Sequence, residues 1–305
     1  MGTSDFGAAI LQKLINNNYG PVLVLTAPDK PVGRKKIITF SPVKQICQRN
    51  GIAVLQPVKT KEAEEKIRKL NPDLIIIAAY GQIIPKSIFE IPKLGALNIH
   101  PSLLPKYRGT SPIQTAILNG EKITGITVFL IDQLIDHGTI IAQKKYSIPE
   151  NIYYKDLERE LSKLASEFIV EIIPKWLKGK LKALPQEEKL ATYTKIIKKE
   201  DGKINWNRPA IQIERQIRAF QPWPGTFTFW ENKNKKIIKI IQGRATESFL
   251  KEKPGKVFST KKERMIVQCK KNGLIIEKLQ LEGKNIMTAK EFILGHQGFV
   301  GAILK

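Results

Sequence analysis

Short runs of consecutive apolar residues, separated by helical stretches, dominate the first 145 residues of this 305-residue chain. Such runs read VLVLTA at 22–27, AVLQP at 53–57, DLIIIAAYG at 73–81, GALNIH at 95–100 and GITVFLI at 125–131. An uninterrupted apolar run bounded by glycine or proline predicts a strand that is buried on both faces. Because helical stretches lie between these runs, the pattern predicts a doubly wound α/β domain with a parallel sheet.

The helical stretches carry their own signals. Ser41 and Pro42 mark the start of one helix, and residues 61–70 predict a second, highly charged one. Residues 155–178 predict a long amphipathic helix with a kink at Pro174, near its end. The apolar positions at helical spacing in this helix are Leu157, Leu161, Leu164, Phe168 and Ile172.

The pattern changes in the last third of the chain. Residues 186–204 are rich in charge and predict a linker, and residues 208–220 predict a helix. Short strands then follow one another with close turns, in the order TFTFW, KKIIKII, GKVFS, RMIVQCK and LIIEKLQLEG, before a final helix at TAKEFILGH. We therefore expect one α/β domain over residues 1–185 and a small β-barrel or β-sandwich domain over residues 205–305.

The net charge of +23 is high for an ordinary enzyme. Residues 1–180 carry 25 basic and 16 acidic side chains, whereas residues 181–305 carry 26 and 12, so the shorter C-terminal part is the more basic. Such an excess predicts attraction to a polyanion such as nucleic acid. The abundance of Lys, Ile and Asn offers a competing explanation, because the codon bias of an AT-rich genome produces the same composition.

Several classes of protein are disfavoured by composition. The chain has no run of 18 uncharged apolar residues, and Asp5 stands where a secretory signal would carry basic residues. We therefore expect a cytoplasmic protein that does not enter a membrane. Cys47 and Cys269 lack CxxC spacing, so neither a disulfide framework nor a zinc site is expected.

The segment that most suggests chemistry is GALNIHPSLLPKYRGTSP, at residues 95–112. Asn98 and His100 stand two apart on an extended segment, so their side chains face the same way and can reach one carbonyl oxygen. Asp136 lies in the loop after the next strand, where it could meet His100 across neighbouring strand ends. Each residue also has a purely structural alternative to a catalytic role. His100 could be a structural, hydrogen-bonded histidine, Asn98 a turn former, and Asp136 part of an Asx turn.

Residues 98–141 closely resemble the catalytic core of the N10-formyltetrahydrofolate-dependent formyltransferases. The shared features are the N-x-H-x-SLLP-x-x-RG block that begins at Asn98 and a later D-x-G at Asp136. The resemblance implies a Rossmann-like catalytic domain, 10-formyltetrahydrofolate as co-substrate and no metal. It implies Asn98, His100 and Asp136 as catalytic residues, and Ser102, Leu103, Leu104 and Pro105 as folate contacts.

Two further segments narrow the resemblance to family members that formylate the α-amino group of initiator methionyl-tRNA for translation initiation. Residues 203–228 resemble the start of their C-terminal, OB-like β-barrel domain. Residues 28–44 resemble their loop that reaches the acceptor stem, which implies tRNA contacts by Arg34, Lys35 and Lys36. Three alternatives stay open: formyl transfer to a small amine, hydrolysis of formyltetrahydrofolate, and RNA binding without catalysis.

The start of the chain departs from the family pattern. Relatives have a β-strand before a G-T-P-D-F turn, whereas this chain starts with Met1 at that turn and has Ser4 in place of the proline. The first strand is therefore expected to be missing, either because the start at Met1 is placed too late or because the chain is truncated. We expect the first case, in which the functional protein has an extra apolar strand before Gly2. Because this strand lies in the interior of a doubly wound sheet, we expect a gap or a displaced neighbour beside the strand at 22–27.

Overall fold

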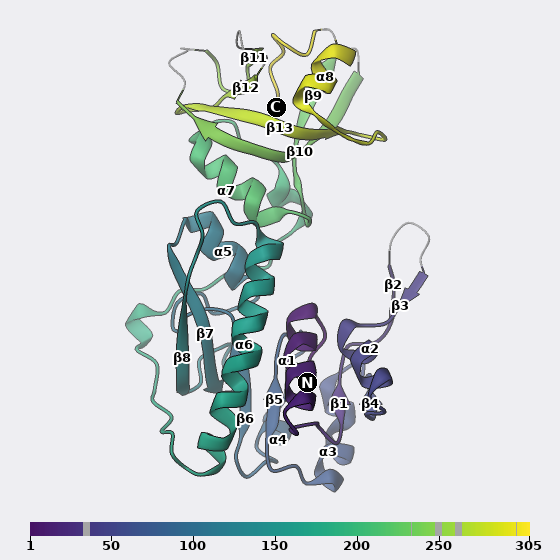
Figure 1. Ribbon diagram of the computed structural model, residues 1–305, viewed down its shortest axis with the longest axis vertical. Helices are drawn as coiled ribbons and strands as arrows, with labels where there is room; N and C mark the ends of the chain where they lie inside the picture. Colours follow the sequence, from purple (N-terminus) through teal and green to yellow (C-terminus); the bar gives the residue numbers. More distant parts are fainter. Residues whose placement is uncertain (33–36, 233, 248–251, 260–263, 297) are drawn as a thin grey trace. The chain divides into compact units, whose positions relative to one another are not determined.

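The computed structural model describes residues 1–32, 37–232, 234–247, 252–259, 264–296 and 298–305. These residues form two compact units (Figure 1). Unit 1 comprises Met1–Pro112, Lys122–Ile148 and Leu157–Thr194, and unit 2 comprises Ile113–Glu121, Pro149–Asp156 and Lys195–Lys305. The segment predicted as a linker, residues 186–204, is thus divided between them.

Strands and helices alternate along the N-terminal part of the chain. The strands are β1 (Val24–Leu25), β2 (Lys30–Val32), β3 (Ile37–Thr39), β4 (Val54–Leu55), β5 (Ile75–Ile77), β6 (Ala96–His100), β7 (Ile123–Leu130) and β8 (Ile140–Ser147). The helices are α1 (Asp5–Asn16), α2 (Pro42–Arg49), α3 (Glu64–Leu70), α4 (Lys86–Phe89), α5 (Pro112–Asn119) and α6 (Tyr154–Leu177). Single 3₁₀ turns lie at Thr60–Ala63, Glu188–Leu190 and Lys199–Gly202.

Local sequence signals account for the helices. The Ser41 hydroxyl accepts a hydrogen bond from the backbone N–H of Lys44 and so caps α2, as predicted. Helix α6 buries the predicted face through Leu157, Leu161 and neighbouring residues, and it continues for three residues beyond Pro174. Its polar face contacts β8, where the Lys144 ammonium lies 3.0 Å from the Glu171 carboxylate.

The main sheet has the strand order β5-β6-β7-β8. Strand β6 runs parallel to β5, but β7 is antiparallel to β6, with His100 opposite Thr127, and β8 is antiparallel to β7. The prediction that residues 125–131 continue a parallel sheet was therefore wrong. A strand that is buried at every position carries no signal of its direction, because the side-chain pattern reports burial and not the polarity of its neighbours.

A gap separates β1 from this sheet, as expected beside residues 22–27. Among the described residues, β1 pairs with β4 and with no strand of the main sheet, and residues 1–3 lie between β1 and the end of β5. The Gly2 N–H donates to the Leu25 carbonyl at 3.0 Å, and the Ala78 N–H donates to the Met1 carbonyl at 2.9 Å. Beyond Met1 lies a cavity of about 490 Å³, whose apolar lining includes Leu14, Leu23, Val24, Ile75, Ile173 and Leu177.

Unit 2 is built on an antiparallel sheet. Its strands are β9 (Thr226–Asn232), β10 (Asn234–Thr246), β11 (Val257–Ser259), β12 (Met265–Gln268), β13 (Gly273–Leu281) and β14 (Ile286–Thr288). The order is β11-β12-β13-β10-β9, with β14 paired to β13. Helix α7 (Ala210–Phe220) packs on this sheet, and α8 (Ala289–Gly295) follows β14.

Residues 301–305 connect the two edges of this sheet. The Val257 N–H on β11 donates to the Ala302 carbonyl at 2.9 Å, and the Phe229 N–H on β9 donates to the Lys305 carbonyl at 2.9 Å. Trp230 and Phe299 pack edge to face beneath them, with ring centroids 5.0 Å apart. The predicted fold class, an α/β domain followed by a small β domain, is confirmed.

Candidate active site

Strand β6 holds Asn98 and His100 on one face, as their spacing predicts. The His100 side chain is buried, and its Nε2 lies 2.9 Å from the backbone carbonyl oxygen of Tyr107. Because a carbonyl oxygen only accepts hydrogen bonds, Nε2 carries a proton and donates it there. The other ring nitrogen, Nδ1, is left facing Asp136.

Asp136 reaches this face by a route that the sequence did not indicate. Since β7 is antiparallel to β6, it ends beside the start of β6, where the Ile131 N–H donates to the Ala96 carbonyl. The loop from 131 to 139 then folds back toward His100, with Asp136 in a left-handed conformation at φ 49°. Gly138 is required at the close of this loop, because an added Cβ would lie 1.7 Å from the Leu130 carbonyl oxygen.

The structure therefore brings the three predicted catalytic residues together. Asn98 Nδ2 lies 3.4 Å from Asp136 Oδ1, and His100 Nδ1 lies 3.5 Å from Asp136 Oδ2. The firmest contact of the carboxylate is with the backbone N–H of Gly109, at 2.7 Å. Asp136 is thus fixed by the main chain, whereas its contacts with the two side chains are long.

The four residues predicted to contact folate differ in exposure. Ser102 and Leu104 are buried, and the Ser102 hydroxyl donates to the Lys106 carbonyl at 2.6 Å. Leu103 and Pro105 are partly exposed. The folate contact of this segment stays a prediction, and the side chains available for it are those of Leu103 and Pro105.

The residues predicted to contact tRNA, which are Arg34, Lys35 and Lys36, lie outside the described residues. Within the described residues, no group of three histidine, cysteine, aspartate or glutamate side chains is arranged to hold a metal ion. In the same part of the chain, no helix has the length and apolar character needed to cross a membrane.

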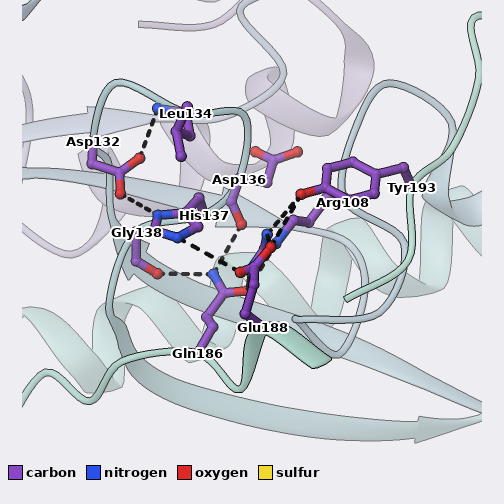
Figure 2. Close-up of polar contacts among 9 residues, drawn as sticks. All are labelled: Arg108, Asp132, Leu134, Asp136, His137, Gly138, Gln186, Glu188 and Tyr193. Carbon is purple, nitrogen blue, oxygen red and sulfur yellow. Dashed lines mark hydrogen bonds and ion pairs between the residues drawn. The ribbon is translucent and has the colours of Figure 1, made fainter. Parts of the chain in front are cut away.

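A polar network beside the site was missed by sequence reasoning (Figure 2). The Arg108 side chain is completely buried, and its guanidinium donates to Gln186, Glu188 and Tyr193. Burial alone lowers the pKa of this guanidinium, but its hydrogen bonds to Glu188 and Tyr193 outweigh burial and raise it. Arg108 could have been singled out from the sequence, because it belongs to the RG pair of the family block. Gln186 lies in the predicted linker, and no sequence motif marks it.

Unit 2 presents lysines beside aromatic rings on β9. The ammonium of Lys235 lies 4.1 Å from the ring centroid of Phe229, and that of Lys203 lies 5.4 Å from it. Phe227 packs edge to face against Phe229, with centroids 5.8 Å apart. Positive charge next to partly exposed aromatic faces suits contact with phosphates and bases.

Both parts of the chain match families of known proteins. Residues 1–173 match the Formyl transferase family, and residues 196–297 match the Formyl transferase, C-terminal domain family. The chain therefore belongs to the formyl transferase family, which agrees with its α/β fold.

The relatives that match over the whole length are more specific. The methionyl-tRNA formyltransferase of Caldanaerobacter subterraneus is 41% identical over 308 residues, covering 100% of this chain and 98% of that protein. That of Thermodesulfovibrio yellowstonii is 42% identical over 300 residues, covering 97% and 94%. One similar solved structure is that of an N-formyltransferase from Helicobacter canadensis in complex with folinic acid and dTDP-3-aminofucose. Its TM-score is 0.66 at 24% identity, and the match covers 90% of this chain and 96% of that protein. This last similarity concerns the fold alone.

Proposed function

We propose that this chain transfers the formyl group of 10-formyltetrahydrofolate to the α-amino group of initiator methionyl-tRNA, in the cytoplasm, for translation initiation. The observation that carries the proposal is the similarity to methionyl-tRNA formyltransferases along both units, at 41% identity over the whole chain. The cluster of Asn98, His100 and Asp136 supports it, because these residues suit formyl transfer to an amine.

Asn98 and His100 are proposed to stabilise the charge that develops during the reaction. As the amine adds to the formyl carbon of the folate, the formyl oxygen gains negative charge. The bond between this carbon and N10 then breaks, and tetrahydrofolate leaves with the proton that the amine has lost. Donors placed where this charge develops lower the barrier. Asn98 offers Nδ2, and His100 offers the Nδ1 side of its ring when that nitrogen is protonated. Because their contacts with Asp136 are 3.4 and 3.5 Å long, Asn98 Nδ2 and His100 Nδ1 are bound only weakly by the carboxylate and stay available to a substrate oxygen.

Asp136 is proposed to orient His100 and to help remove the proton of the attacking amine, directly or through water. A carboxylate can accept this proton only if it stays in place while the amine approaches. The hydrogen bond from the Gly109 N–H to Asp136 Oδ2, at 2.7 Å, keeps the carboxylate in place. No side chain of the chain needs to form a covalent bond with the formyl group.

The substrates are proposed to contact separate surfaces. Ser102–Pro105 follows His100 directly in the chain, so the partly exposed side chains of Leu103 and Pro105 are suited to pack on a folate ring. Arg34, Lys35 and Lys36 are proposed to bind tRNA phosphates, together with lysines of unit 2 such as Lys203 and Lys235. The 26 basic and 12 acidic side chains of residues 181–305 support this assignment.

Three other functions compete with this one. Formyl transfer to a small amine and hydrolysis to formate could use the same three residues, but neither reaction requires a basic C-terminal unit. A non-catalytic RNA-binding protein would keep the charge, but it would not require the cluster of Asn98, His100 and Asp136. The 41% identity to a methionyl-tRNA formyltransferase over the whole chain favours the tRNA substrate.

One set of assays separates these functions. The purified chain is given 10-formyltetrahydrofolate with initiator methionyl-tRNA, with free methionine, or with water alone, and formyl-methionyl product and formate are measured. We expect formylation of the charged tRNA well above formylation of free methionine, and little formate. Dominant formate release would indicate a hydrolase, and tRNA binding without product would indicate a non-catalytic RNA-binding protein.

A further inference from the structure

Residues 184–194, here called the strap, are attached to unit 1 at both ends. At one end the strap pairs with β8, where the Leu184 N–H donates to the Ile140 carbonyl at 2.8 Å and the Ile140 N–H returns the bond at 2.7 Å. At the other end the Arg108 N–H donates to the Thr192 carbonyl at 2.9 Å. The strap therefore follows a defined path beside the Asp136 loop.

Arg108 directs its side chain onto the strap. Its Nε and Nη2 donate to Gln186 Oε1 at 3.1 and 2.9 Å, and Nη1 donates to the Tyr193 hydroxyl at 2.9 Å. Two further bonds of 2.9 Å reach the Glu188 carboxylate. Because the Glu188 side chain is 60% exposed, water and salt weaken its pairing, and the bonds to the half-buried Gln186 are the better protected ones.

Gln186 connects the Arg108 guanidinium to the Asp136 loop (Figure 2). Its Nε2 donates to the backbone carbonyl of Asp136 at 2.9 Å and to that of Gly138 at 2.8 Å. These two carbonyls belong to the Asp136–His137 and Gly138–Thr139 peptides, so Gln186 holds the loop on both sides of the His137–Gly138 pair. Asp136 needs such support because its left-handed conformation is unfavourable for a residue with a side chain.

Arg108 and Gly109 thus hold Asp136 from two directions. The Gly109 N–H binds the carboxylate, and the Arg108 side chain holds the backbone carbonyl through Gln186. A carboxylate that is fixed at both its backbone and its oxygen atoms keeps its distance to His100 and Asn98. Fixing a reacting group in this way preserves its rate of proton transfer, because a shift of about 1 Å can cost about 100-fold.

We propose that Gln186 is a positioning residue for Asp136, anchored by Arg108 and acting across the strap. The proposal rests on the proposed function, because it assigns importance to Asp136 in the reaction. The alternative is that Gln186 only attaches the strap to unit 1 and has no effect on the chemistry.

Two substitutions of Gln186 separate these roles. Gln186→Met removes all of its hydrogen bonds, whereas Gln186→Glu keeps an acceptor for Arg108 and removes both donors to the Asp136 loop. We expect both variants to lose about 10- to 100-fold in kcat, with smaller changes in KM for tRNA and folate. A wild-type kcat in Gln186→Glu would overturn the proposal, since only the attachment to Arg108 would then matter.

Gln216 in unit 2 provides a matched control. Its Nε2 also donates to two backbone carbonyls, those of Asp201 at 2.7 Å and Lys203 at 3.2 Å. Gln216→Met should lower the thermal midpoint and leave kcat at saturating tRNA unchanged. A change in its KM for tRNA is not counted, because the Lys203 that Gln216 holds is proposed to contact tRNA. Equal losses of kcat in both variants would indicate general destabilisation and would contradict a positioning role.

A double-mutant cycle tests whether Gln186 acts through Asp136. In an Asp136→Asn background the backbone carbonyl remains but the carboxylate is gone, so Gln186→Met should lower the residual rate much less than in the wild type. The same fold loss in both backgrounds would overturn the proposal.

Amide hydrogen exchange adds a readout that does not depend on the reaction. Exchange in residues 133–139 should accelerate in Gln186→Met and stay unchanged in Gln216→Met. A wild-type chain that formylates no tRNA would contradict the proposed function. Unchanged exchange in Gln186→Met would contradict the stabilisation of the Asp136 loop by Gln186, whatever the activity of the chain.

Discussion

At the scale of single residues, His100 is the side chain on which the proposed chemistry most depends. One ring nitrogen is bound to the Tyr107 carbonyl, so the ring cannot turn away from the site without losing that bond. His100→Ala should lose on the order of 10²–10³ in kcat, the usual effect of removing one oxyanion donor. Single-turnover formyl transfer measures this loss. Near-normal turnover would show that His100 is structural.

At the scale of elements, the C-terminal residues test the closure of the unit 2 sheet. Leu304 is buried beside Trp230, whereas its neighbour Ile303 is 44% exposed. Leu304→Ala should lower the free energy of unfolding by about 2–5 kcal/mol, because it leaves a cavity where the two sheet edges meet. Ile303→Ala, the matched control, should cost clearly less. Urea unfolding of both variants measures the difference, and equal costs would argue against a closed sheet.

At the scale of the whole molecule, the charge of the chain predicts how tRNA affinity depends on salt. Replacing Arg34, Lys35 and Lys36 with alanine should weaken binding and make the plot of log K against log salt less steep, by about 0.7–0.9 for each tRNA phosphate that is no longer neutralised. The control replaces the exposed residues Lys175, Lys178 and Lys180, which removes the same charge elsewhere. An unchanged affinity and slope in the first variant would mean that residues 34–36 are only a solvated loop.

Much of the fold could be read from local patterns. Helix α6 follows from the periodicity of its apolar residues, which reports the burial of a face within a few consecutive residues, and the cap at Ser41 follows from its residue type. Strands β2, β3, β8 and β14 match no predicted run. The same-face placement of Asn98 and His100 on β6 follows from the alternation of side chains along a strand. The resemblance of residues 98–141 to formyltransferases then identified Asp136 as their companion.

Tertiary structure alone decided how these elements meet. The direction of β7, and therefore the path by which Asp136 returns to His100, depends on strand pairing that no local pattern records. The contact between Arg108 and Gln186 joins residues 78 apart in the sequence, and a glutamine in a charged segment resembles any solvated residue. Periodicity reports which side of an element is buried, because burial is a property of one face. It does not report which distant residues lie against that face, because their identity depends on how the whole chain packs.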